Sequence, residues 1–349
     1  MDNKQSINQR NISYDLIRVA AMLLVLINHT MAEFGTGVSA ESVFSSVCMA
    51  LSRGGVPLFV MLSGALLVRS QGVDPLRTAV NRAADVLRPL VFWSLVYYVA
   101  FNVLIYKDAS WRSFLLLVQE PGSGSHLWYL YMLIPLYLLL PVFQILASKD
   151  HMKTVRYVLA LWLVFSGCFQ YIESLTGWQL YENLHLLNGY AGYFLAGWYV
   201  TNSHWQISKG KLAVCASAAL IGLVIALIAL PFDSALKREV VSYTGLPMIV
   251  LSVSLFCLLK QWGDTCRIGP KARGVIALTS KVSFCVYLCQ LVMRAAAHRV
   301  VLYSGWQGIP GTLLLFVLTV ALSLGFSLCV YRIPNNAVTV SIKKYLGIK

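Results

Sequence analysis

Two ionisable side chains, Arg18 and His29, share one face of the first long apolar segment of the sequence. Asp15, Arg18, Met22, Val25 and His29 follow one another at steps of three or four residues, the period of one helix face. At about 1.5 Å of rise per residue, Arg18 and His29 lie about 16 Å apart along that helix. Ionisable residues inside a membrane helix are candidates for function. The alternatives are a helix-end histidine bonded to a neighbour, and an arginine that anchors the cytoplasmic end.

A third candidate, Arg53, stands at a break in the second apolar segment, where Gly54, Gly55 and Pro57 follow it. An arginine in such a segment must find an anion, a carbonyl group or water, and glycine lets the backbone approach a ligand closely. The break predicts either a kinked helix or two half-helices, with Arg53 in contact with a ligand. The alternative is an ion pair between Arg53 and a loop glutamate such as Glu41.

Other polar side chains open later apolar segments. Arg82 and Arg88 precede the third segment and, with Arg77, form either an anion-binding patch or a set of topology charges. His126 and Trp128 open the fourth segment, where an interfacial aromatic belt explains the tryptophan better than the histidine. Tyr287 and Gln290 are polar groups inside the ninth segment, and such groups more often join helices than contact a substrate.

The elements that position these residues are membrane helices. Apolar residues make up 58% of the 349 positions and charged residues only 12%, whereas soluble domains are about one-quarter charged. Mean hydropathy is +0.68, and the apolar segments approach the roughly 20 residues that span a bilayer. We expect an all-α integral membrane protein with a single bundle of about ten transmembrane helices, near residues 16–34, 43–68, 87–106, 127–147, 155–171, 186–201, 212–230, 246–262, 275–297 and 309–331.

Lysine and arginine alternate between the two sides of this bundle, which predicts that both termini are cytoplasmic. The expected organisation is an N-terminal tail (1–13), a transmembrane domain (14–335) and a C-terminal tail (336–349). The net charge of +14 is assigned to topology and to anionic lipid, so no nucleic-acid partner is expected. The eight cysteines form no CxxC pair, and no metal site is predicted. No acidic residue lies in the middle of a predicted helix, which argues against a proton-coupled pump.

The motifs together resemble the acyltransferase-3 family, in which an Arg or Lys, ten intervening residues and a His open the first helix. Residues 14–29 fit that spacing through Arg18 and His29. Residues 53–64 resemble the second block of the family, with its Pro-hydrophobic-Phe and Ser-Gly pairs, and residues 126–130 resemble its aromatic block. Later blocks are matched by Tyr193-Phe194 with Gly197 and by residues 283–288. The resemblance covers almost the whole chain, in matching order.

This resemblance implies a standalone bacterial O-acyltransferase of the inner membrane, without the SGNH domain that some members carry. Such enzymes take acetyl from cytoplasmic acetyl-CoA, a co-substrate, and pass it to a hydroxyl of a cell-surface polysaccharide or lipid-linked glycan precursor. The sequence departs from the family pattern twice. Arg82 and Arg88 are six residues apart instead of forming Arg-x-x-Arg, and Gln290 stands where members often have histidine. A polysaccharide or lipid-linked sugar translocator without acyl transfer is the main alternative function.

Within that resemblance, His29 is predicted to be the general base, because imidazole titrates near neutral pH. Asp15 is predicted to hold Arg18, which would stabilise charge in the transition state. Glu33, four residues after His29, could orient its ring. Residues predicted to contact the donor are Arg18, Arg53, Arg82 and Arg88, and residues predicted to contact the acceptor are Ser63, His126, Trp128, Tyr287 and Gln290.

Overall fold

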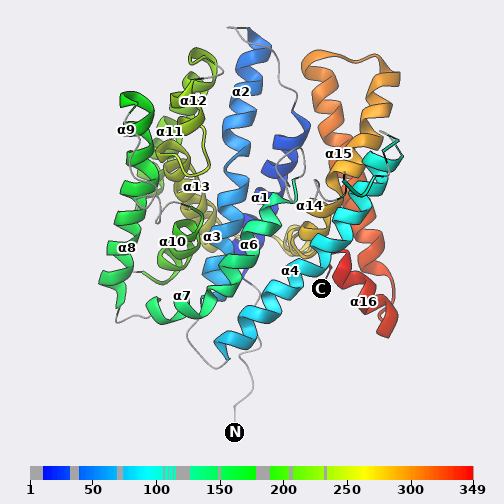
Figure 1. Ribbon diagram of the computed structural model, residues 1–349, viewed down its shortest axis with the longest axis horizontal. Helices are drawn as coiled ribbons and strands as arrows, with labels where there is room; N and C mark the ends of the chain where they lie inside the picture. Colours follow the sequence, from blue (N-terminus) through cyan, green and yellow to red (C-terminus); the bar gives the residue numbers. More distant parts are fainter. Residues whose placement is uncertain are drawn as a thin grey trace.

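The protein is described by a computed structural model that covers residues 11–31, 39–68, 74–104, 107–108, 110–112, 114, 126–147, 151–177, 189–203, 207–231 and 234–348. Over these residues the chain is helical and has no strand (Figure 1). The elements are α1 (Ile12–Thr30), α2 (Ala40–Ser52), α3 (Gly55–Leu67), α4 (Pro75–Tyr97), η1 (Tyr98–Val103), α6 (Trp128–Leu138), α7 (Leu140–Leu146), α8 (Met152–Val164), η3 (Phe165–Phe169), α9 (Gln170–Thr176), α10 (Ala191–Asn202), α11 (Lys209–Ala229), α12 (Ala235–Val240), α13 (Leu246–Thr265), α14 (Pro270–Ser304), α15 (Gly308–Arg332) and α16 (Ala337–Tyr345).

Eight of the described helical segments are long and apolar enough to cross a membrane, and α6 with α7 makes a ninth if this pair, bent by 54°, counts as one span. The prediction of an all-helical, multi-pass membrane protein is therefore confirmed, whereas the count of about ten spans is not. The difference lies mainly in α10, because its described part has only 12 residues. The cytoplasmic position of both termini stays a prediction.

The break at Arg53 is mild. Arg53 and Gly54 keep helical backbone angles, so α2 and α3 form one span of 28 residues, Ala40–Leu67. Gly55 is required there, because a Cβ atom at this position would lie 2.9 Å from the carbonyl oxygen of Ala21 in α1. Of the two predicted forms, the structure has the kinked helix, and the glycine lets it pass close to α1.

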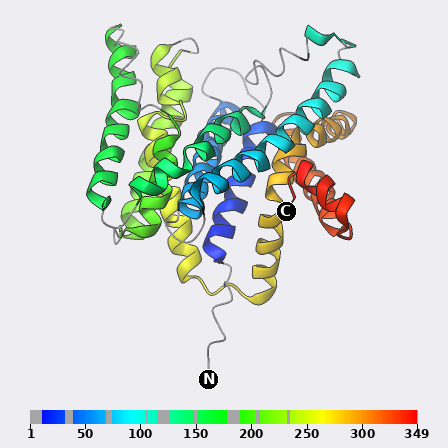
Figure 2. The same cartoon turned by 60° about the horizontal axis from the view of Figure 1, so that its bottom comes forward.

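Helix α1 lies inside the bundle, where it packs against α2, α3, α13, α14 and α15. Helices α8 and α9 lie at one end of the bundle, and α15 and α16 lie at the other (Figure 1). Figure 2 shows α1 between the yellow helices α13 and α14 near the end of the bundle from which the N-terminus emerges. The residues of α1 that face these neighbours, such as Ile17 and Ala21, are completely buried. Any polar side chain on α1 that faces inward is therefore inside the protein.

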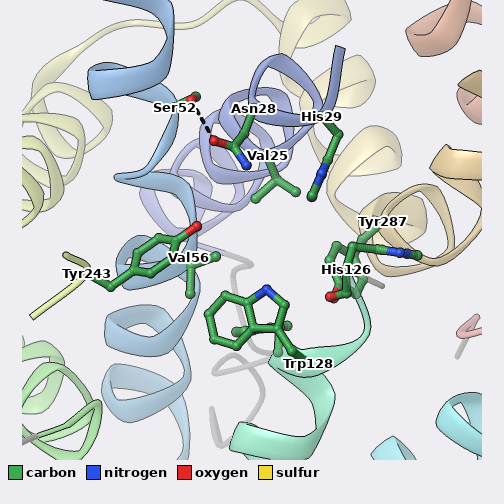
Figure 3. Close-up of a pocket in the computed structure, with 10 residues that line it drawn as sticks. Val25, Asn28, His29, Ser52, Val56, His126, Trp128, Tyr243 and Tyr287 are labelled. Atoms are coloured by element: carbon green, nitrogen blue, oxygen red, sulfur yellow. Dashed lines mark hydrogen bonds between the residues drawn. The ribbon is translucent and has the colours of Figure 1, made fainter. Parts of the chain in front are cut away.

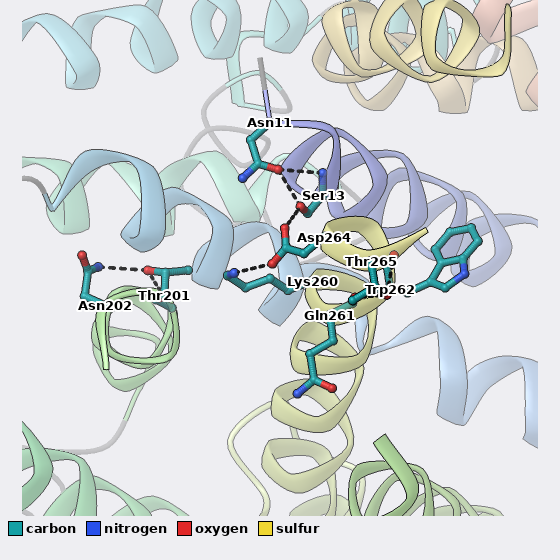
Figure 4. A network of polar contacts seen from close by, with 10 residues as sticks. Asn11, Ser13, Thr201, Asn202, Lys260, Gln261, Trp262, Asp264 and Thr265 are labelled. Atoms are coloured by element: carbon teal, nitrogen blue, oxygen red, sulfur yellow. Dashed lines mark hydrogen bonds and ion pairs between the residues drawn. The ribbon is translucent and has the colours of Figure 1, made fainter. Parts of the chain in front are cut away.

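Polar contacts fix the first turn of α1 (Figure 4). The side chain of Asn11 accepts a hydrogen bond from the Ser13 amide at 2.9 Å, and the Ser13 hydroxyl donates to the carboxylate of Asp264 in α13. Asp264 also forms an ion pair with Lys260, with Nζ and Oδ2 2.7 Å apart. A Cβ atom at Gly263 would lie 2.6 Å from the Cα of Ser13. This end of α1 is thus joined to α13, which fixes the height of Arg18 and His29 in the bundle.

Candidate active site

The start of α1 meets α14 at a buried serine. The Ser280 hydroxyl donates to Asp15 Oδ1 at 2.6 Å, and Arg18 Nη1 donates to Ser280 Oγ at 3.2 Å. Asp15 is only 3% exposed, so the hydrogen bond from Ser280 satisfies a buried carboxylate. Ser280 thus contacts both Asp15 and Arg18. Sequence reasoning missed this residue, because only the packing of α1 on α14 brings it to Arg18.

Ser63 lies with the Arg18 group and not with His29. Its hydroxyl is 3.3 Å from the hydroxyl of Tyr137 in α6. Tyr137 interacts electrostatically with Arg18 and Arg82. Ser63 does not line the cavity around His29 that is described next. Ser63 thus lies on the Arg18 side of the bundle. The predicted contact between Ser63 and the acceptor stays a prediction.

His29, at the end of α1, lines a cavity of about 30 Å³ (Figure 3). This volume is enough for a water molecule or two. The cavity is formed by α1, the end of α2, the start of α3, the residues around the start of α6, the loop before α13, and α14. The lining residues are Val25, Asn28, His29, Ser52, Val56, His126, Trp128, Tyr129, Tyr243 and Tyr287. Four sequence-predicted site residues, His29, His126, Trp128 and Tyr287, thus meet in one place, and none of the ten lining residues is acidic.

His126 contributes a buried imidazole ring to this cavity. Its ring centroid lies 5.9 Å from that of His29 and 5.1 Å from that of Tyr287. The Tyr287 hydroxyl donates to the backbone carbonyl of His126, which fixes the turn before α6. The side chain of His126 is buried, and neither ring nitrogen has a hydrogen-bond partner among the described residues. Such a group costs about 1–3 kcal/mol, so the position indicates a place for a ligand or water.

Gln290 is the neighbouring predicted acceptor contact. It lies on α14, is fully buried, and donates from Nε2 to the carbonyl of Tyr287 at 2.9 Å. Its Oε1 is buried without a partner in the described part of the chain. Gln290 does not line the cavity itself. It adds a second unpaired polar atom on the helix that carries Tyr287.

Aromatic rings form the opposite wall of the cavity. The ring centroid of Trp128 lies 5.8 Å from that of Tyr190 and 5.4 Å from that of Tyr243. The guanidinium carbon of Arg53 lies 4.9 Å from the centroid of the Tyr243 ring, which is a cation–π distance. Burial raises the pKa of Tyr243, and the positive charge of Arg53 opposes that shift. Tyr243 therefore stays protonated at neutral pH and remains a hydrogen-bond donor.

Asn28, Ser52 and Tyr243 belong to this cavity but were absent from the predicted site. The Ser52 hydroxyl donates to Asn28 Oδ1 at 3.2 Å (Figure 3). Asn28 precedes His29, about 100° away around the helix, so the face that predicted His29 does not include it. Tyr243 lies in a loop, where helical periodicity carries no signal. The adjacency to His29 and Arg53 was the only clue to Asn28 and Ser52 in the sequence.

The predicted donor arginines fall into separate places. Arg53 is next to Ser52 on the His29 side. The proposed alternative partner Glu41 stands at the other end of α2, where its carboxylate lies next to Gly308. Arg82 and Arg88 lie on an exposed face of α4, 3.9 and 3.4 Å from the carboxylate of Asp85. The donor contacts of these three arginines stay predictions. Glu33, predicted to orient His29, lies outside the described residues.

The site offers a histidine in a small cavity, a second histidine whose ring nitrogens have no hydrogen-bond partner among the described residues, and neutral donors from Asn28 and Tyr243. About 16 Å along the same helix, the Arg18 guanidinium offers a charge-assisted contact for an anion. This arrangement suits transfer of a group between a hydroxyl and an activated carbonyl compound. A family model described as an acyltransferase domain matches residues 11–331, nearly the whole chain. No curated protein and no solved structure gave a match.

Proposed function

We propose that this chain, which belongs to the acyltransferase-3 family, is a membrane O-acetyltransferase that uses cytoplasmic acetyl-CoA. Family membership implies acyl transfer to a sugar or glycan. The acceptor proposed here is a hydroxyl of a cell-surface polysaccharide or lipid-linked glycan precursor, at the bacterial inner membrane. The observation that carries the proposal is the position of His29, which faces His126 across a cavity and shares a helix with Arg18.

In the proposed reaction, the His29 imidazole takes the proton of the acceptor hydroxyl as the hydroxyl oxygen attacks the thioester carbonyl. The carbon–sulfur bond then breaks, the proton passes from His29 to the departing sulfur, and the products are the acetyl ester and coenzyme A. Asn28 and Tyr243 line the same cavity, so their N–H and O–H groups can stabilise the oxyanion. Arg18 and, farther out on α4, Arg82 and Arg88 bind the phosphates of the donor.

The cavity of about 30 Å³ is far smaller than an acetyl group with a sugar. Both substrates therefore bind by moving the surrounding side chains apart. The donor approaches from the side of the bundle where Arg18 lies, and the acceptor approaches His29 from the opposite side. The two substrates meet where His29 and His126 face each other.

Replacing His29 tests the base assignment. We expect His29→Ala to reduce acetyl transfer from acetyl-CoA to surface polysaccharide by about 10²- to 10⁴-fold, the usual contribution of a general base. Acetylation is measured by mass spectrometry of glycans from cells that express each variant. His298→Ala is the matched control, because His298 is exposed on α14, and it should behave as the wild type. Normal acetylation by folded, membrane-inserted His29→Ala protein would refute the assignment.

Thermal protection tests the donor and separates the enzyme from a sugar translocator. Acetyl-CoA should raise the melting temperature of the purified protein, since a ligand at 100 times its Kd adds about 2.7 kcal/mol of stability. Arg18→Ala should lose most of that protection because it removes a charge-assisted contact. Arg332→Ala, at an exposed position at the end of α15, should keep it. A protein that acetyl-CoA does not protect at all would favour the translocator.

A further inference from the structure

Two arginines that flank the His29 region, Arg53 and Arg294, have no carboxylate partner among the residues that the structure describes. No carboxylate of the described residues lies within salt-bridge distance of Arg53 or Arg294, and Nε of each is buried without a hydrogen-bond partner in the same part of the chain. A guanidinium in the middle of a membrane helix is costly unless it meets an anion, a carbonyl group or water. Two such charges in one region are therefore expected to meet an anion.

Both arginines lie on the side of the bundle where His29 is found. Arg53 follows Ser52, which is bonded to Asn28, and its guanidinium lies against Tyr243 in the cavity wall. Arg294 is seven residues after Tyr287, so it shares the face of α14 that reaches the cavity and lies about 10.5 Å farther along the helix. Arg294 also interacts electrostatically with His29.

The donor phosphates cannot be the anion that serves both arginines. Ser280 of α14 is beside Arg18, and Arg294 is fourteen residues farther along the same helix, which is about 21 Å. A donor whose phosphates remain at Arg18 brings only its thioester to His29, because the thioester is the reacting end. The anion at Arg53 and Arg294 must then come with the other substrate.

His126 supplies the remaining contact for that substrate. His126 is 3% exposed, it lines the cavity, and both ring nitrogens lack a partner among the described residues. Trp128, on the opposite wall of the cavity, offers an aromatic face for a sugar ring. The cavity therefore has hydrogen-bonding and stacking groups for a sugar, with positive charge on two sides.

We propose that the acceptor is an anionic glycan, whose carboxylate or phosphate groups contact Arg53 on one side of the cavity and Arg294 on the other while its reactive hydroxyl lies between His29 and His126. This inference rests on the proposed acetyl transfer and adds the chemical class of the acceptor. It assigns Arg53 to the acceptor and not to the donor. Arg53 and Arg294 select a negatively charged acceptor, because guanidinium groups bind carboxylates and phosphates in bidentate geometry.

The acceptor charge is tested with the native glycan precursor, so that the identity of the sugar need not be known. Membranes from cells that lack this gene supply unacetylated precursor, which is used in three forms. One is intact, one has its carboxylates converted to methylamides with carbodiimide, and one is released from its lipid phosphate by mild acid. The purified full-length protein acetylates each form with radiolabelled acetyl-CoA. We expect kcat/KM to fall by about tenfold or more in one treated form, the loss typical of a removed charged hydrogen bond.

The treated form that loses activity identifies the source of the charge as a sugar carboxylate or the lipid phosphate. Equal activity of the three forms would overturn the anionic acceptor and leave the proposed acetyl transfer intact. Absence of transfer to the intact form, with wild-type protein that acetyl-CoA stabilises, would instead contradict the proposed acceptor class as a whole.

Variants then connect the charge to the two arginines. Arg53→Gln and Arg294→Gln should each raise KM for the intact acceptor by about tenfold, leave KM for acetyl-CoA unchanged, and show no further loss with the neutralised acceptor. Arg294→Lys keeps the charge and should recover part of the activity, which separates binding from folding. Arg299→Gln, at an exposed position on α14, is the control. A rise in KM for acetyl-CoA in Arg53→Gln would return Arg53 to the donor.

Discussion

The Ser280 hydroxyl connects two larger side chains, those of Asp15 and Arg18. It donates to Asp15 and accepts from Arg18, so the guanidinium is held in place against α14. The face of α1 that bears Asp15, Arg18 and His29 could be predicted from helical spacing alone. Ser280 could not, because its role depends on which helix packs against α1, and 265 residues separate it from Asp15.

We therefore expect Ser280→Ala to destabilise the protein by about 1–3 kcal/mol, because a buried carboxylate loses a hydrogen bond. KM for acetyl-CoA should rise in the same variant, since Arg18 loses its fixed position. Both quantities are measured on protein in detergent, by thermal unfolding and by initial rates. Ser341→Ala, at an exposed position in α16, should change neither. An unchanged KM in Ser280→Ala would show that Arg18 is positioned by other contacts.

Helix α3, which contributes Val56 to the cavity, packs closely against α10. Helices α3 and α10 approach each other through Gly64 and Gly197. A Cβ atom at Gly64 would lie 1.8 Å from the carbonyl oxygen of Phe194, and one at Gly197 would lie 1.8 Å from that of Met61. Small residues at such crossings are typical of membrane helices. The family motifs in the sequence include residues 53–64 and the stretch around Gly197. They could not show that the two segments touch, because helical periodicity describes one helix at a time.

Alanine substitutions at Gly64 and Gly197 test the close contact between α3 and α10. Gly64→Ala and Gly197→Ala should each lower the melting temperature and the yield of folded protein, because backbone on the neighbouring helix must move. Gly222→Ala in α11 is the matched control, as no atom lies within 4 Å of its added Cβ. In that control, alanine should be neutral or stabilise the helix by about 0.5–1 kcal/mol. Equal stability of all three variants would contradict the close α3–α10 contact.

At the scale of the whole molecule, composition and hydropathy predicted the architecture, and the positions of nearly all the helices agree with it. The short described length of α10 and the bend of 54° between α6 and α7 did not follow from hydropathy, because apolar composition does not encode where a helix bends. The loop that places Tyr243 in the site was equally hidden. Sequence reasoning therefore found His29, His126, Trp128 and Tyr287, and it missed Asn28, Ser52 and Tyr243, which only the packing of the chain brings to the cavity.

Orientation in the membrane can be measured directly. With both termini cytoplasmic, a fluorescent protein that folds only in the cytoplasm should be bright when fused after residue 349. Alkaline phosphatase, which is active only outside the cytoplasm, should be inactive at the same position. Inserted between α14 and α15, near Gly305, the phosphatase should be active instead. The reverse pattern would place Arg18 at the outer side and contradict donor entry from the cytoplasm.

Helix α14 has 35 residues, which corresponds to about 52 Å, whereas the hydrocarbon core of a bilayer is about 30 Å thick. The helix must tilt or project beyond the lipid, and Tyr303 near its end is 93% exposed. Ser280, Tyr287 and Arg294 lie along one stripe of this rod at seven-residue intervals. We expect α14 to tilt more in a thinner bilayer, which would move these three residues together relative to α1. We therefore expect lipid composition to change the position of these α14 residues relative to Arg18 and His29 of α1.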